Sequence, residues 1–162
     1  MPEVAWRAGI DLNPLDVSDE ADVAWLSCLI WPGEQGRVER LHAAAAAARR
    51  HLPVLHQGDL LDDLPNVAAQ APSEATLVVY HSGVLAYVDQ DKRRAFAAAV
   101  ADLGAVWLSN EAEGVLPNLD LDLDRRPGTF VLVREAATSS LAPTRTGHGS
   151  SGRTMLLPVG DR

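Results

Sequence analysis

Four apolar runs in this chain each end on a small cluster of polar residues, and helix-like stretches separate the runs. With their polar ends, the runs cover residues 10–13, 54–59, 77–83 and 106–111. Strands that alternate with helices predict an α/β fold with a mostly parallel sheet. In an open parallel sheet, ligands bind beyond the carboxyl ends of the strands. Because Asp, His, Ser, Asn and Glu come at those ends, the sequence predicts a ligand pocket there.

The composition limits the class of protein. At 162 residues the chain can bury a substantial core, and we expect a single domain over residues 1–162. The formal net charge of −8 argues against partners that favour Lys and Arg, namely nucleic acid and anionic membranes. No apolar stretch approaches the roughly 20 residues that span a bilayer, and no signal-peptide pattern is present. The single cysteine, Cys28, has apolar neighbours that predict a buried thiol. We expect a cytoplasmic protein without disulfides.

Periodicity and end signals predict the individual elements. A helix capped by Ser18 is followed by a second helix over residues 35–50, and a third is capped by Asp89 or Asp91. Gly104 is expected to end that third helix. The expected strands cover residues 4–12, 53–58, 75–80, 105–108, 129–133 and 154–157, with a helical turn at 63–70.

The last two expected strands have no helix between them. This arrangement predicts an antiparallel hairpin at the end of an otherwise parallel sheet. The connection over residues 138–153 is rich in Ser, Thr and Gly and is expected to be flexible.

This order of elements resembles the class I S-adenosylmethionine-dependent methyltransferases, whose sheet ends in such a hairpin. A closer similarity is to a bacterial family of unknown function, domain of unknown function 2332. Its matching segments are collinear and cover most of the chain up to about residue 115. They are residues 7–17 (RAGIDLNPLDV), 31–32 (WP), 58–60 (GDL), 79–87 (VYHSGVLAY) and 107–111 (WLSNE).

The methyltransferase resemblance implies a three-layer, Rossmann-like sheet and S-adenosylmethionine as cofactor. Asp11, with Asn13 beside it, matches the acid that binds the ribose hydroxyls, for which a carboxylate is suited as a double acceptor. The segment Gly58-Asp59-Leu60 matches the turn beside the adenine. His81 lies at the end of the strand that faces the transferring methyl group in that fold. On this interpretation His81 or Glu111 would meet an unidentified small-molecule acceptor.

One part of the methyltransferase pattern is absent from this sequence. The glycine-rich turn that should precede Asp11 is not found, since no G-x-G occurs between Met1 and His51. We therefore expect an N-terminally truncated chain, incomplete or inactive by itself as a methyltransferase. The alternative is a non-catalytic α/β module that assembles through its sheet edge, with a homodimer or a missing N-terminal segment completing the sheet.

Each candidate residue also has a structural interpretation. Asp11 and Asp59 can bond to nearby backbone amides and so stabilise turns, and Glu111 can simply begin a loop. His81 can be a satisfied structural group or, with a pKa near 6.5, a general base. Ser82 lacks the G-x-S-x-G pattern of a hydrolase nucleophile.

Two further sets of residues are given structural roles. His56, Asp59 and His81 have spacings that match no known metal motif, so no metal site is assigned. The tryptophans at positions 25, 31 and 107 are expected in the core or at its rim.

Overall fold

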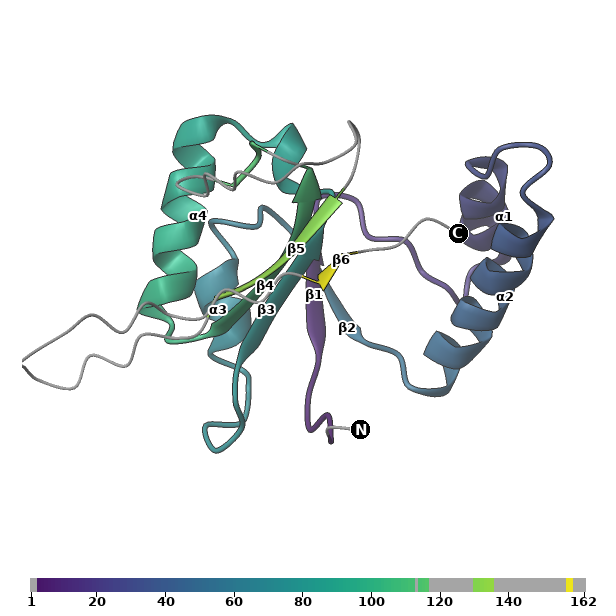
Figure 1. The fold of residues 1–162 in the computed structure, drawn as a ribbon. Coiled ribbons are helices and arrows are strands. Elements are labelled where there is room, and N and C mark those ends of the chain that lie inside the picture. Colours follow the sequence, from purple (N-terminus) through teal and green to yellow (C-terminus); the bar gives the residue numbers. More distant parts are fainter. Residues whose placement is uncertain (1–2, 113, 117–129, 136–156, 159–162) are drawn as a thin grey trace, which may run out of the picture. The chain divides into compact units, whose positions relative to one another are not determined.

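The computed structural model describes residues 3–112, 114–116, 130–135 and 157–158 (Figure 1). The chain divides into two units, Met1–Asp63 and Leu64–Arg162, here called the N-terminal and C-terminal units. Each unit has its own sheet and its own helices. No helix within the described ranges is both long enough and apolar enough to span a membrane.

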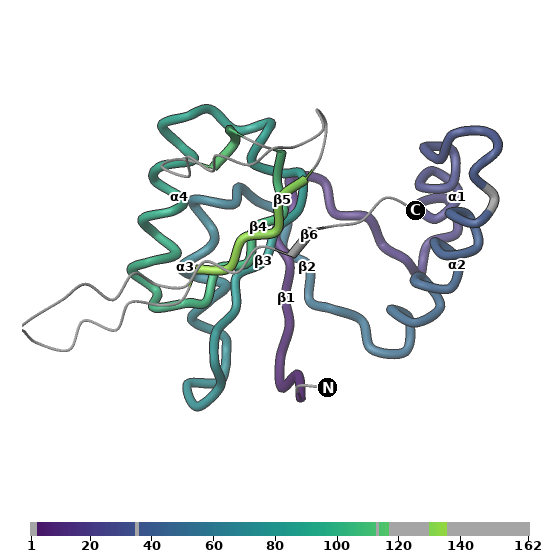
Figure 2. The backbone as a smooth tube through the Cα atoms, viewed as in Figure 1, coloured from purple at the N-terminus to yellow at the C-terminus, as the bar shows by residue number. Residues whose placement is uncertain are grey.

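The N-terminal unit combines a two-stranded sheet with a pair of helices. Strand β1 (Ala8–Asp11) pairs in parallel with β2 (Val54–Gln57), so that Ala8 lies opposite Val54 and Asp11 opposite Gln57. Helices α1 (Glu20–Cys28) and α2 (Gln35–Arg50) connect the two strands and pack on each other (Figure 2). Parallel strands need such a long connection, because a tight turn would reverse the chain direction.

Local chemistry explains where these two helices lie. Asp19 is the N-cap of α1, and its side chain accepts a hydrogen bond from the Ala21 amide at 2.8 Å. The predicted cap, Ser18, was therefore wrong by one residue. Helix α2 has the predicted bounds and consists largely of alanine, the strongest helix former. Arg49 and Arg50 occupy its last turn, where positive charge favours the helix dipole.

The C-terminal unit contains a four-stranded mixed sheet in the order β3-β4-β5-β6. Strand β3 (Val78–Ser82) is parallel to β4 (Val106–Ala112), whereas β5 (Phe130–Glu135) is antiparallel to β4 and to β6 (Leu157–Pro158). The remaining elements are α3 (Leu64–Ala68), the short 3₁₀ helix η1 (Leu85–Tyr87) and α4 (Gln90–Asp102).

Helix α4 covers one face of this sheet and forms the core with it. Phe96 contacts the rings of His81 and Trp107 from the helix side. Asp89 caps the helix by accepting from the Lys92 amide at 2.9 Å, and Gly104 ends it with a φ of +63°. Both end residues are among those predicted. The buried apolar side chains of this unit are Leu64, Val67, Leu85, Phe96, Val100, Ala105, Trp107, Val131 and Val133.

The structure confirms a mixed α/β chain, but it corrects the expected sheet. The pairing of β5 with β6 confirms the predicted antiparallel hairpin. The larger sheet is nevertheless mixed rather than mostly parallel, because β5 is also antiparallel to β4, and β3 and β4 are the parallel pair among its described strands. Strand β3 begins three residues later than the expected 75–80 strand, and β4 continues to Ala112, past the expected end at residue 108. The predicted connection over residues 138–153 lies outside the described residues.

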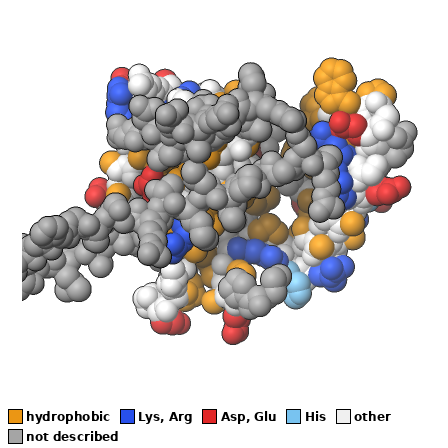
Figure 3. All heavy atoms as spheres, in the orientation of Figure 1, with side chains coloured by type: hydrophobic (Ala, Val, Ile, Leu, Met, Phe, Trp, Pro, Cys, Tyr) orange, Lys and Arg blue, Asp and Glu red, His pale blue; other side chains and the backbone are white. Residues whose placement is uncertain are grey.

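Three predictions of burial were wrong, all in or after α1. Cys28 is exposed, Trp25 is 58% exposed and Trp31 is 77% exposed. The reason is that α1 carries apolar residues on all its faces and buries only Val23. Figure 3 shows hydrophobic side chains at the surface of the α1–α2 region. Trp107, in contrast, is buried as expected.

Candidate functional site

The carboxyl ends of β3 and β4 bring the two predicted catalytic residues into contact. The parallel register places His81 beside Ser109, and Glu111 follows two residues later on the same strand. Burial alternates along β4, so that Trp107, Ser109 and Glu111 all face the side covered by α4. His81 is buried on that side as well.

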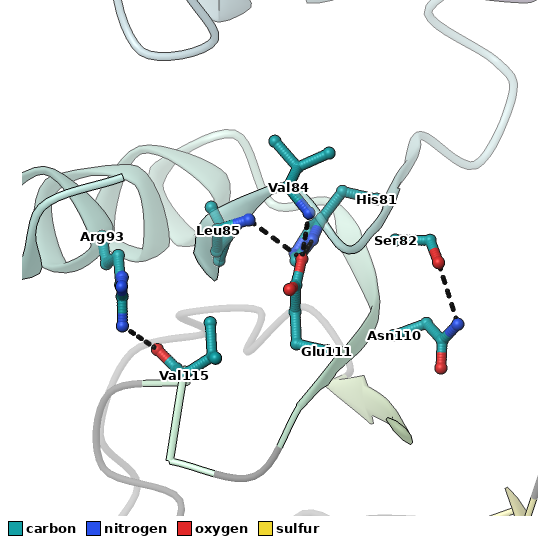
Figure 4. Close-up of polar contacts among 8 residues, drawn as sticks. All are labelled: His81, Ser82, Val84, Leu85, Arg93, Asn110, Glu111 and Val115. Carbon is teal, nitrogen blue, oxygen red and sulfur yellow. Dashed lines mark hydrogen bonds and ion pairs between the residues drawn. The ribbon is translucent and has the colours of Figure 1, made fainter. Parts of the chain in front are cut away.

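Glu111 is the centre of this site. Its Oε1 accepts hydrogen bonds from His81 Nδ1 at 2.7 Å, from the Val84 amide at 2.9 Å and from the Leu85 amide at 3.0 Å (Figure 4). The Glu111 side chain is 1% exposed. Several N–H donors on one carboxylate stabilise its charge where water has been excluded. Because a carboxylate only accepts, the hydrogen of neutral His81 lies on Nδ1.

The imidazole of His81 lies between two aromatic rings. Its centroid is 5.7 Å from that of Phe96, in an edge-on arrangement, and 5.8 Å from that of Trp107. Burial lowers the pKa of His81 below its ordinary value of 6.5, although the hydrogen bond to Glu111 and the charge of that carboxylate both raise it. His81 is therefore neutral at pH 7 and retains an acceptor nitrogen, Nε2.

Several polar atoms of this site have no hydrogen-bond partner among the described residues. They are buried and comprise His81 Nε2, Glu111 Oε2, Ser109 Oγ and Trp107 Nε1. Buried polar atoms in folded proteins are nearly always paired, so such a concentration is unusual. A buried acceptor without a hydrogen bond, such as Nε2, has lost its contact with water and therefore lowers the stability of the folded state. Its lone pair is not occupied by a donor of the described residues.

The loops that follow β3 and β4 are held together at the same edge. Arg93 of α4 donates to the carbonyl oxygens of Val88 at 2.7 Å, Ala86 at 3.3 Å and Val115 at 3.3 Å. Nearby, Asn110 Nδ2 donates to Ser82 Oγ at 2.9 Å (Figure 4). Unlike His81, Ser82 is exposed and so presents a hydroxyl at the surface.

In the N-terminal unit, the first set of predicted cofactor residues lies at the carboxyl ends of β1 and β2. The Gly58 amide donates to the Asp11 carbonyl at 3.0 Å, so the two strand ends are adjacent. Asp11 Oδ1 accepts from the Asn13 amide at 2.8 Å. The Asp11 carboxylate thus stabilises its own turn, which is the structural role considered for it in the sequence analysis. Asp11 is nevertheless exposed to solvent.

The turn after β2 is built on a second pair of carboxylates. Asp59 Oδ1 accepts from the Leu61 amide at 2.8 Å, and Asp63 Oδ2 accepts from the Asp59 amide at 2.9 Å. Glycine at position 58 leaves room for this contact, because a Cβ atom there would lie 1.9 Å from Asp63 Oδ2 and would force the Asp63 side chain to move. Leu60 is half-buried in the same turn.

The structure therefore forms two separate sets from the predicted residues. His81 and Glu111 are in direct contact in the C-terminal unit, and the other five belong to two neighbouring turns of the N-terminal unit. Sequence reasoning missed two residues, Asp63 and Arg93. The Asp63 contact had a signal, a carboxylate four residues after Asp59 in a turn. Arg93 had none, because its acceptors are backbone carbonyls.

No three or more His, Cys, Asp or Glu side chains within the described part of the chain are grouped so that they could hold a metal ion.

Fold and site together define a mixed α/β protein with a buried His–Glu pair at the carboxyl ends of two parallel strands. The chain belongs to a family described as "Uncharacterized protein conserved in bacteria (DUF2332)", whose model matches residues 1–152. No curated protein and no solved structure matches the chain. The similarity to domain of unknown function 2332 is thus confirmed, whereas the methyltransferase resemblance stays a prediction.

Proposed function

We propose that this protein binds a small molecule containing a nucleoside at the carboxyl ends of its parallel strands, with S-adenosylmethionine as the cofactor. The observation that carries the proposal is the hydrogen bond from the Gly58 amide to the Asp11 carbonyl. It places the Asp11 carboxylate next to the Gly58-Asp59-Leu60 turn. Ligands of α/β sheets bind at such strand ends, where an acidic side chain can accept from ribose hydroxyls.

The donor set of this edge suits an adenosine group. Asp11 is exposed, and the Asn13 amide occupies its Oδ1, while Oδ2 has no partner among the described residues. A carboxylate can accept several hydrogen bonds, so the turn contact does not prevent a contact with a ribose hydroxyl. Leu60, half-buried in the adjacent turn, offers an apolar surface suited to adenine.

Methyl transfer to a small-molecule acceptor is the activity that we propose with this cofactor. S-adenosylmethionine, when bound, supplies an electrophilic methyl group. Such enzymes act mainly by holding donor and acceptor in line, with modest acid–base help.

A calorimetric titration with S-adenosylhomocysteine tests the binding proposal. We expect micromolar binding by the native chain and at least about a tenfold loss in Asp11→Ala, because a hydrogen bond to a charged group contributes about 1.5–3 kcal/mol. Asp16→Ala is a matched control, since Asp16 Oδ1 accepts from the Ser18 amide at 2.7 Å in the same kind of turn. Affinity should be unchanged in this control. No binding by the folded native chain would exclude this cofactor.

A second candidate is a non-catalytic module that assembles through a sheet edge, and the strand count of the smaller sheet favours it. Within the described residues that sheet has two strands, and Val54 and Leu55 of β2 are 52% and 45% exposed. Two-stranded sheets are marginal alone, and open edges invite further strands. Self-association is then expected, and sedimentation measures it as a mass that rises with concentration. A monomer at all concentrations would contradict this candidate.

A further inference from the structure

One oxygen atom joins three parts of the C-terminal unit. Glu111 Oε1 on β4 accepts from His81 on β3 and from the amides of Val84 and Leu85 in the segment that follows β3. That segment, residues 83–88, begins at Gly83, which has a φ of +64° and ends the strand in a turn. Its first half is therefore held closed by a single buried carboxylate.

Ionisable side chains hold this segment at its two ends. Arg93 binds the carbonyls of Ala86 and Val88 at its far end, and an arginine does not titrate in the physiological range. His81 and Glu111 hold the near end. Helix η1 contributes one titratable side chain, Tyr87, which is 90% exposed to water. The His81–Glu111 end is thus where pH can act.

The surroundings of His81 suit the neutral ring and not the charged one. Nε2 is buried and has no acceptor within the described residues, and the neighbouring side chains are the rings of Phe96 and Trp107. Adding a proton to Nε2 would create a buried N–H donor without a partner, which is unfavourable in the closed structure. The negative charge of Glu111 offsets this penalty only in part, because burial has the larger effect and lowers the His81 pKa.

We propose that His81 and Glu111 form a proton-controlled latch on residues 83–88. With neutral His81 the segment is closed, and protonation of Nε2 favours an open state in which the Glu111 contacts to Val84 and Leu85 are broken. Opening hydrates the His81 ring and rearranges the carboxyl end of β3. The inference deepens the proposed function by naming its regulation, and it rests on that function only for the ligand.

The linkage between proton binding and opening fixes the sign of the pH dependence and sets its upper limit. The open state binds a proton at the ordinary His pKa of 6.5, whereas the closed state binds it more weakly. Between these two pKa values, the open population therefore rises by at most about tenfold for each unit that the pH falls. Above pH 6.5 the latch is closed and no longer depends on pH.

Amide hydrogen exchange, followed by NMR on the full chain without ligand, tests the latch. After correction for intrinsic exchange rates, opening at the Val84 and Leu85 amides should rise as the pH falls below 6.5. His81→Asn is the matched variant, because the asparagine amide can donate to Glu111 from the Nδ1 position and does not titrate. Its Val84 and Leu85 amides should open equally at every pH. The Val100 amide, inside α4, reports global unfolding, and its opening should stay much rarer than that of Val84 and Leu85 at every pH.

Each other outcome overturns the inference. Identical pH profiles in the native chain and His81→Asn would remove His81 from the mechanism. Opening at Val84 and Leu85 that is no more frequent than opening at Val100 would show global unfolding instead of a local latch. If His81→Asn does not fold, the native titration decides: the His81 ring signals and the two amides must share one midpoint below pH 6.5, and different midpoints contradict the latch. Since no ligand is present, failure of cofactor binding leaves this readout unaffected.

Discussion

The two units place carboxylates at equivalent positions, at the carboxyl ends of parallel strands, but satisfy them in different ways. In the N-terminal unit, Asp11 and Asp59 accept from amides two residues further along the chain, and Asp11 is exposed to water. In the C-terminal unit, Glu111 is buried and accepts from donors 26 to 30 residues away. The first arrangement shapes a turn and keeps a carboxylate accessible to a ligand. The second holds the fold together.

Removing the Glu111 carboxylate should have the largest effect. Glu111→Ala leaves the ring N–H of His81 and the amides of Val84 and Leu85 without their acceptor, and each buried donor left unpaired costs about 1–3 kcal/mol in the free energy of unfolding. Glu111→Gln should cost about 1–3 kcal/mol, because the amide oxygen still accepts. Urea denaturation measures both. A loss below about 1 kcal/mol in Glu111→Ala would show that the two units do not differ in this way.

The second-largest effect should be the change of folding stability with pH, and His81 should be its source. Because the His81 pKa is lower in the folded state, the unfolded chain binds more protons between that pKa and 6.5. The His81 contribution to stability is complete above pH 6.5 and falls below it, by at most about 1.4 kcal/mol per pH unit. Comparison of the native chain with His81→Asn at several pH values isolates this contribution. Equal slopes of unfolding free energy against pH in the two proteins would refute this contribution.

Gly58→Ala should cost about 1–2 kcal/mol, an intermediate effect in the N-terminal unit. The new methyl group would meet Asp63 Oδ2, so Asp63 must rotate and release the Asp59 amide. Gly36→Ala is the control, since it meets no atom within 4 Å in helix α2 and should raise stability by about 0.5–1 kcal/mol. Thermal melts of the two variants should therefore shift in opposite directions.

Asp11→Ala should have the smallest effect on stability, below about 1 kcal/mol, because water can replace its exposed contact to the Asn13 amide. Asp11→Asn, which keeps an acceptor, should differ from the native chain by less than about 0.5 kcal/mol. Chemical denaturation checks both values. A loss of stability comparable to that of Glu111→Ala would mean that Asp11 also holds the fold together. The proposed difference between the two units would then be wrong.

The sequence predicted those contacts of the site whose hydrogen-bond partners are close together along the chain, and it missed those whose partners are far apart. The turn contacts of Asp11 and Asp59 were foreseen, because Asp bonds readily to amides two residues away. His81 and Glu111 were both chosen as candidates from their place after apolar runs. Their contact was not foreseen, because it depends on the register of β3 against β4.

The sequence by itself determined the elements whose hydrogen bonds are local. The bounds of α2, the Asp89 cap and the Gly104 end all follow from propensity and from contacts within a few residues. Tertiary structure alone decided the pairing of β5 with β4, the exposure of Trp31 and the burial of Glu111. These depend on which surfaces meet across the chain, and residue patterns along a single element do not specify that choice.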